Sequence, residues 1–184
     1  ESVELDMNPS FVEALDVQVA TEQFGTLKVD IAFGGIFYAL IDCAQLGISI
    51  ERSSAKKIVE IGCEVQRQLN KELEIVHPEN DQLKGIAYTM LIDKGPNGEL
   101  RSATVLPPGR VDRSPCGTGN SARMAVMYAR GEVAVGDTYS AYSIIGSRFD
   151  MTVAGTTAVA GRVAVLPKVS GRGWIHGIHQ IGVD

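Results

Sequence analysis

The spacing of apolar residues along the chain predicts many short strands. Alternating or short continuous apolar segments bounded by turn residues are typical of strands. The segments with this pattern are residues 17–20, 27–33, 37–41, 86–92, 101–106, 138–145, 148–153, 162–166 and 173–181. Glycine and proline separate many of them, and Gly95-Pro96-Asn97-Gly98 predicts a tight turn between two neighbouring strands.

Two further segments carry apolar residues at helical spacing. The first spans residues 54–70, and Ser53 or Ser54 can cap its start. The second follows the glycines after Cys116 and ends at Gly131, because a glycine after a helix readily takes the left-handed conformation. The side chains of this helix that we expect to be buried are Ala122, Ala125, Val126 and Ala129. Strands and helices do not alternate regularly, so the pattern predicts an α+β domain and argues against a Rossmann domain.

Composition and charge narrow the class of protein. The 184 residues are 45% hydrophobic and 21% charged, which is typical of a single soluble domain. The 17 Lys and Arg residues against 22 Asp and Glu residues give a formal net charge of -5. This charge argues against a nucleic-acid partner, because binding phosphates requires a concentrated basic face. No apolar run approaches the roughly 20 residues that span a bilayer, and the first residues do not resemble a signal peptide.

The three cysteines, Cys43, Cys63 and Cys116, are odd in number and irregular in spacing. They form no CxxC pair, which argues against a disulfide framework and against a zinc site. We therefore expect a cytoplasmic protein without a metal. Cys43 and Cys63 lie at apolar periodic positions and are expected to be packing residues.

Residues 112–123, DRSPCGTGNSAR, place Cys116 immediately before the second predicted helix. Glycine on both sides of Thr118 allows a ligand to approach the backbone closely. Free amides and the positive end of the helix dipole favour anions there, so they favour the thiolate of Cys116. They could also hold a substrate carboxylate at Gly117 and Thr118. The residue types alone leave open a second interpretation, in which Cys116 is a small buried residue beside a tight turn.

The segment DRSPCGTGNSAR resembles the signature of the proline racemase family, which usually reads DRSPCGTGTSAR. Asn120 therefore stands where threonine is usual. Other segments that are similar to the family are residues 29–39, 76–78, 143–147 and 171–177. Family members are nearly twice as long, and their first half carries a Met-Cys-Gly-His motif, with the other catalytic cysteine, that this sequence lacks. The resemblance implies that residues 1–184 form the second lobe of a two-lobed enzyme that is excised, cleaved or incomplete here. It also implies a diaminopimelate-epimerase-like fold, with a strand-rich sheet or barrel wrapped around a central helix.

The resemblance further implies an isomerase that racemises proline or epimerises 4-hydroxyproline without a cofactor. In such an enzyme one thiolate removes the Cα proton, and a thiol on the opposite face returns a proton. Cys116 would be one of these two groups, and the amides of Gly117 and Thr118 would bind the substrate carboxylate. Asp112 would pair with the ring nitrogen. Separately from the resemblance, Tyr88 and the segment 33–38 could wall the pocket, but aromatic residues in strands are more often part of the core. The full-length enzyme is expected to be a homodimer that binds a small molecule.

Several alternatives remain open. Asp112 could instead stabilise its loop by pairing with Arg113. A trans-3-hydroxyproline dehydratase of the same family typically carries threonine at the position of Cys116, so the cysteine favours epimerisation. A single lobe could also be a non-catalytic carboxylate-binding fragment, because one thiol cannot serve both faces of the substrate carbon.

The histidines bear on two other classes of site. A cysteine-nucleophile hydrolase requires a histidine base, and His77, His176 and His179 lie in no recognisable motif. His176 and His179 are three residues apart in a predicted strand, so their side chains would point to opposite faces. This spacing argues against a metal pair.

Overall fold

The computed structural model describes residues 2–175 and 177–182. Its helices are α1 (Ala55–Glu72) and α2 (Gly117–Ala129), with short 3-10 turns η1 (Cys43–Leu46) and η2 (Arg52–Ser54). The strands are β1 (Ser2–Asp6), β2 (Ser10–Ala20), β3 (Thr26–Phe33), β4 (Phe37–Asp42), β5 (Val76–His77), β6 (Asn80–Lys84), β7 (Ile86–Lys94), β8 (Leu100–Leu106), β9 (Arg110–Val111), β10 (Thr138–Tyr142), β11 (Arg148–Val159) and β12 (Arg162–Arg172). Within these described residues, no helix is long and apolar enough to cross a membrane.

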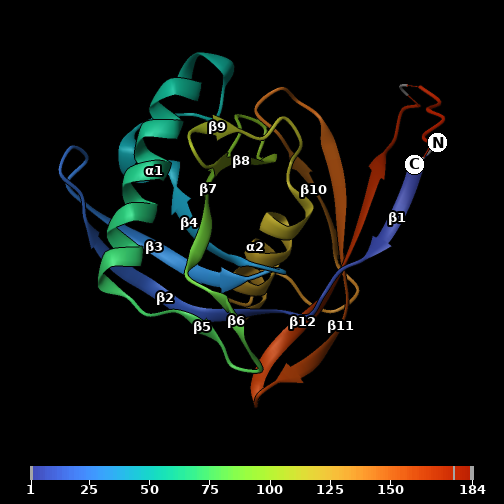
Figure 1. Ribbon diagram of the computed structural model, residues 1–184, viewed down its shortest axis with the longest axis horizontal. Coiled ribbons are helices and arrows are strands. Elements are labelled where there is room, and N and C mark those ends of the chain that lie inside the picture. The colour runs from blue at the N-terminus through green and yellow to red at the C-terminus, as the bar shows by residue number, and fades with distance from the viewer. Residues whose placement is uncertain (1, 176, 183–184) are drawn as a thin grey trace.

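The main sheet curls round until strands from its two ends meet. Neighbouring strands follow the order β2-β3-β4-β7-β8-β10-β11-β12, and β12 pairs again with β2 at Ala164↔Phe11 and Val165↔Ser10. β1 extends the sheet beyond β12, β9 attaches to β8, and β5 and β6 form a separate small sheet. Figure 1 shows α2 surrounded by these strands and α1 on the outside. The expected α+β fold, a strand-rich barrel around a central helix, is confirmed.

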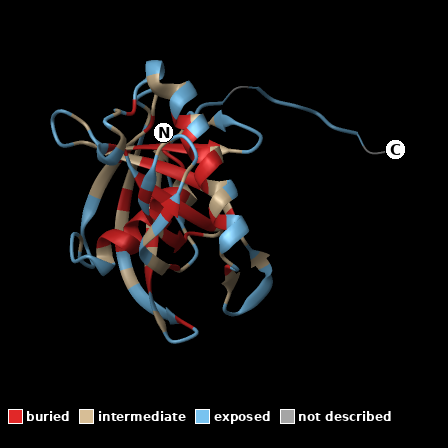
Figure 2. Cartoon of the chain, turned by 90° about the vertical axis from the view of Figure 1, so that its left-hand side faces the viewer, coloured by how far each residue is buried: buried red, intermediate tan, exposed pale blue. Residues whose placement is uncertain are grey.

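The alternation of side chains in β3 and β4 divides the core into an outer and an inner part. Residues of these strands that face the outer core are Ile31, Phe33, Phe37, Ala39 and Ile41, which pack with the buried face of α1. The intervening residues Ala32, Tyr38 and Leu40 pack with α2 in the inner core. Successive side chains of a strand point to opposite faces, so a strand covered on both sides is apolar throughout. Figure 2 shows the buried residues gathered in the interior of the molecule.

α2 is buried on nearly all sides because the sheet encloses it. Every residue from Gly119 to Met127 is buried, including Arg123, whose Nη1 donates to the backbone oxygen of Arg101 at 2.9 Å. Buried polar groups in proteins usually have a hydrogen-bond partner, as the Arg123 guanidinium has here. The expectation that Ala129 is buried was wrong, because the last turn of the helix reaches solvent. Gly131 follows the helix with a φ of 71°, as predicted for the residue that ends it.

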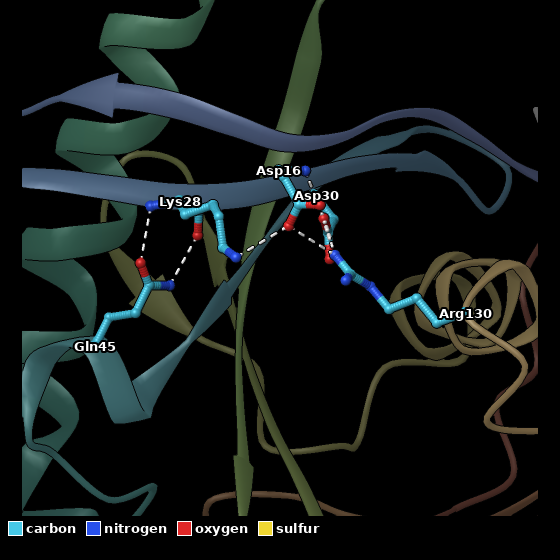
Figure 3. A network of polar contacts seen from close by, with 5 residues as sticks. All are labelled: Asp16, Lys28, Asp30, Gln45 and Arg130. Carbon is cyan, nitrogen blue, oxygen red and sulfur yellow. Dashed lines mark hydrogen bonds and ion pairs between the residues drawn. The ribbon is translucent and has the colours of Figure 1, made fainter.

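A polar network ties the end of α2 to β2 and β3 (Figure 3). Arg130 Nη2 lies 3.1 Å from Asp16 Oδ1 and 2.7 Å from Asp30 Oδ1, and Lys28 Nζ lies 3.2 Å from Asp16 Oδ1. The side chain of Gln45 bonds to the backbone of Lys28 in both directions. The hydrogen bond from Arg130, followed by that from Lys28, lowers the pKa of Asp16. The network therefore fixes the end of α2 that is opposite to Cys116.

Two further details differ from the sequence-based expectations. Ser54 stands before α1 but makes no capping hydrogen bond, since the turn η2 leads directly into the helix. The strand expected over residues 138–145 ends at Tyr142, because Ser143 and Ser147 close a turn through their backbones at 2.9 Å and their hydroxyls at 2.7 Å.

The strand expected over residues 173–181 is absent from the described part of that segment. β12 ends at Arg172, whose partner Ser2 is the first residue of β1. The chain after β12 extends from the body as an exposed segment (Figure 2). Its apolar residues are correspondingly exposed, with Trp174 at 70% and Ile178 at 97%.

Candidate active site at the start of α2

Cys116 is the residue immediately before α2, and its backbone is in an uncommon conformation. Its φ of 66° and ψ of 106° lie where residues other than glycine are seldom found. The residue is only 8% exposed. Its Sγ lies 3.4 Å from Tyr38 Oη and 3.7 Å from Thr118 Oγ1. The thiol is therefore turned into the inner core of the barrel, toward hydroxyl groups.

Asp112 is connected to the backbone of Cys116 through Ser114. The carboxylate accepts from the Ser114 N–H at 2.8 Å and from its hydroxyl at 3.0 Å, while Ser114 Oγ accepts from the Cys116 N–H at 3.1 Å. The carboxylate thus holds Ser114 of its own loop, in agreement with a loop-stabilising role, and among the described residues it forms no ion pair with Arg113. Asp112 stays partly exposed, so a ligand can still reach it.

Asn120 stabilises the loop before α2 through hydrogen bonds to its backbone. It is fully buried, and its Nδ2 donates to the backbone oxygens of Pro115 and Cys116 and to Ser102 Oγ. The Ser102 hydroxyl itself donates to the oxygen of Pro115 at 3.0 Å. The position that departs from the family signature thus contributes directly to holding the peptide before Cys116. Sequence reasoning noted this departure but not its role.

The first amides of α2 have no side-chain cap. Gly117 and Thr118 are both partly exposed and adjacent to Cys116, so the predicted carboxylate-binding amides do lie beside the thiol. The turn between β3 and β4 packs directly on this helix start. A Cβ at Gly34 would lie 2.6 Å from the amide nitrogen of Ala122 and would also collide with the backbone oxygen of Thr118. The Gly34-Gly35 pair is therefore explained by this close approach.

Two tyrosines line the inner core around the sulfur. Tyr88, one of the predicted pocket residues, packs edge-to-face on Tyr38 with 5.9 Å between ring centroids. Tyr38 is the residue that reaches Cys116, and it is fully buried. Burial, together with the adjacent Cys116, raises the pKa of Tyr38 far above its ordinary value, so its hydroxyl keeps its proton.

A groove of about 1380 Å³ opens beside the loop that precedes α2. Its lining residues come from that loop, from the segment 145–150 and from the end of β12. Asp112 and Ser114 line the groove, whereas the buried Cys116 does not. The charged residues of its walls are four arginines, Arg110, Arg113, Arg148 and Arg172, and two aspartates, Asp112 and Asp150, so positive charge is in excess even though Arg148 pairs with Asp150. The groove can therefore receive an anionic small molecule within reach of the loop.

Neither of the two described histidines, His77 and His179, forms a site with Cys116. His77 packs against Phe11 and Phe33, with ring centroids 5.5 and 4.6 Å apart, in the outer core. His179 lies in the exposed segment after β12, so the prediction of a strand around it was wrong, and His176 lies outside the described residues. Across the described ranges, no cluster of three or more His, Cys, Asp or Glu side chains is arranged to hold a metal.

The other two cysteines are packing residues, as expected. Cys43 is fully buried in the outer core, and Cys63 packs against the same core from α1. Burial, followed by the nearby charge of Asp93, raises the pKa of Cys43 to about 12. A thiol with such a pKa stays protonated and unreactive at neutral pH.

The sequence model of the family described as proline racemase matches residues 1–184, the whole of this chain. The chain belongs to the proline racemase family. Curated relatives include proteins named 4-hydroxyproline 2-epimerase from Allorhizobium ampelinum, 50% identical, and from Rhizobium etli, 45% identical. Both matches cover 100% of this chain and 53% of the relative, so the chain spans about half the length of the relatives it matches.

Solved structures of the family have the same fold. A hydroxyproline epimerase from Agrobacterium vitis, with bound trans-4-hydroxy-L-proline, is 50% identical and superposes with a TM-score of 0.94 over 98% of this chain and 52% of that one. A probable proline racemase from Agrobacterium radiobacter, with bound carbonate, is 44% identical and has a TM-score of 0.95 over 100% of this chain and 54% of that one.

Proposed function

We propose that this chain is the Cys116-bearing lobe of an enzyme that epimerises 4-hydroxyproline at Cα without a metal or an organic cofactor. The observation that carries the proposal is the placement of Cys116. Its thiol lies beside the uncapped start of α2, and a groove fit for a small anion opens next to its loop. The names of the relatives at 45–50% identity support 4-hydroxyproline as the substrate.

The chemistry follows from these groups. Amides of Gly117 and Thr118 hold the substrate carboxylate at the positive end of α2, where negative charge is favoured. Asp112 pairs with the cationic ring nitrogen. The Cys116 thiolate takes the Cα proton, and the charge that develops is stabilised by the amides on the carboxylate. A second acid/base, from a part of the protein outside these residues, returns a proton on the opposite face.

The test uses the intact enzyme after dialysis against a chelator. Cys116→Ser should lower the rate of epimerisation by about 10²–10⁴-fold or more, because serine is nearly isosteric but a far weaker acid. Cys63→Ser is the matched control, since Cys63 packs on the outer core and should tolerate the change. Chiral chromatography follows the product, and deuterium uptake at Cα in heavy water follows proton exchange.

Two results would reject the proposal. One is epimerisation by Cys116→Ser at the rate of the unmodified protein. The other is a strict requirement for added metal or pyridoxal phosphate. Circular dichroism of both variants separates loss of chemistry from loss of fold.

A further inference from the structure

We propose that Tyr38 is a positioning residue that holds the sulfur of Cys116 in both of its protonation states, with Thr118 as the second member of the arrangement. The proposal rests on the proposed function, because only an acid/base cysteine has to alternate between thiol and thiolate. It assigns a role to a tyrosine that lies in a strand, far from the cysteine in sequence.

The geometry fixes the Tyr38 hydroxyl between two partners. Its Oη lies 2.7 Å from Thr118 Oγ1 and 3.4 Å from Cys116 Sγ, and the third side of the triangle, from Sγ to Oγ1, is 3.7 Å. Tyr38 is fully buried, and Tyr88 packs on its ring. A Cβ at Gly119 would lie 3.2 Å from the Tyr38 ring and 3.2 Å from the Cys116 sulfur, so both groups pack closely against this glycine.

This triangle suits a group that must gain and lose a proton. A hydroxyl group both donates and accepts, whereas a thiol donates and a thiolate only accepts. With the thiolate, Tyr38 O–H donates to sulfur, and the Thr118 O–H donates to Tyr38. With the thiol, S–H donates to Tyr38, whose own O–H then donates to Thr118. Only hydrogens rotate between the two arrangements, so no heavy atom has to move.

Apart from the sulfur, the groups that form the triangle are neutral. Tyr38 retains its proton because of its burial. Tyr88 lies on the far side of the Tyr38 ring, from β7. Asp112 faces the site from the preceding loop and reaches the Cys116 backbone through Ser114. The Tyr38 hydroxyl is thus the side-chain donor nearest to the sulfur, and removing it should disfavour the thiolate.

The experiment is alkylation of Cys116 by iodoacetamide as a function of pH in the intact protein, followed by mass spectrometry of its peptide. In Tyr38→Phe the pH at which the alkylation rate is half-maximal should rise by about one to two units, because the thiolate loses one hydrogen bond. The kcat of epimerisation should fall by about 10–100-fold, and KM should change little. Tyr139→Phe is the matched control, because it removes a partly buried hydroxyl that donates to the backbone oxygen of Asn120 at 3.4 Å and not to sulfur.

A second pair of variants keeps the proposal testable if Tyr38→Phe does not fold. Thr118→Val should shift the alkylation profile in the same direction by a smaller amount, and Thr118→Ser should restore it. An unchanged profile in a folded Tyr38→Phe, or an equal shift in Tyr139→Phe, would overturn the proposal. Alkylation needs no substrate, so this outcome is independent of whether Cys116→Ser abolishes epimerisation.

Discussion

Asp112 is the residue whose two roles most need to be separated. Its carboxylate holds Ser114 and is proposed to pair with the ring nitrogen of the substrate. Asp112→Asn keeps one oxygen for the Ser114 N–H but removes the charge. We expect ligand affinity to fall by about 10–100-fold, because one charge-assisted hydrogen bond is lost. Calorimetric titration with pyrrole-2-carboxylate, a planar analogue that carries the carboxylate, measures this change.

Asp150 provides the control for this measurement. It lines the same groove but bonds to Ser140 at 2.6 Å and to Arg148, so Asp150→Asn should leave affinity near that of the unmodified protein. If Asp112→Asn binds as tightly as the unmodified protein, the carboxylate serves only the loop. The binding site would then be reduced to the amides at the start of α2.

How much of the site can be predicted from sequence depends on the distance along the chain. Asp112, Cys116, Gly117 and Thr118 lie within one short segment, so a single local motif contains all four. Tyr38 lies 78 residues from Cys116 and reaches its sulfur only through the pairing of β4 within the barrel. No local pattern encodes that contact, and an aromatic residue in a strand is typical of any core.

At the scale of elements, Gly62 decides how closely α1 approaches the sheet. A Cβ at this position would lie 2.5 Å from Thr89 Oγ1 and 2.7 Å from Val105 Cγ2. Gly62→Ala gains about 1 kcal/mol of helix propensity. Overpacking of a core costs about 1–3 kcal/mol, and here both neighbours lie on the sheet itself. We therefore expect a net loss of free energy of unfolding of up to about 2 kcal/mol, measured by urea denaturation.

The comparison for Gly62→Ala is Lys57→Ala on the exposed face of the same helix. Surface substitutions of this kind usually stay within about 0.5 kcal/mol. A stabilised Gly62→Ala protein would contradict the prediction, because helix propensity would then outweigh the close packing.

The elements that could be predicted from the sequence are those with a buried face. α1 and β7 recur close to their expected bounds because their apolar residues repeat with the period of the element. β1 was missed because all five of its residues are exposed, so no buried face imposes an alternation of apolar and polar residues. The described part of residues 173–181 shows the reverse error, since its apolar residues alternate although β12 ends at Arg172.

At the scale of the whole molecule, the closure of the barrel joins segments more than 150 positions apart in the sequence. Local patterns predict strands but not their order, because pairing depends on partners that no short segment contains. The resemblance to the family, rather than periodicity, therefore indicated a barrel around a central helix. The seam itself is short, with two residue pairs between β2 and β12.

Side chains reinforce this seam, and Arg162 is central to them. It forms an ion pair with Glu13 across the two strands, and its guanidinium lies 5.5 Å from the centre of the Phe11 ring. An exposed ion pair contributes about 0–1 kcal/mol and a cation–π contact about 0.5–1 kcal/mol. Arg162→Ala should therefore lower the free energy of unfolding by about 0.5–2 kcal/mol, because both contacts are lost while the buried residues of the seam keep their packing.

Hydrogen exchange can localise this effect. In Arg162→Ala, the amides of Ser10, Phe11 and Ala164 should exchange faster, while those at the centre of β7 keep their protection, because only the seam loses contacts. Arg148→Ala is the control, since its ion pair with Asp150 lies within β11 and away from the seam. Faster exchange throughout the sheet in Arg162→Ala would mean that the barrel opens as one cooperative unit. Unchanged exchange rates at the seam would mean that backbone pairing alone closes the barrel. Either of these two results would reject a local role for Arg162.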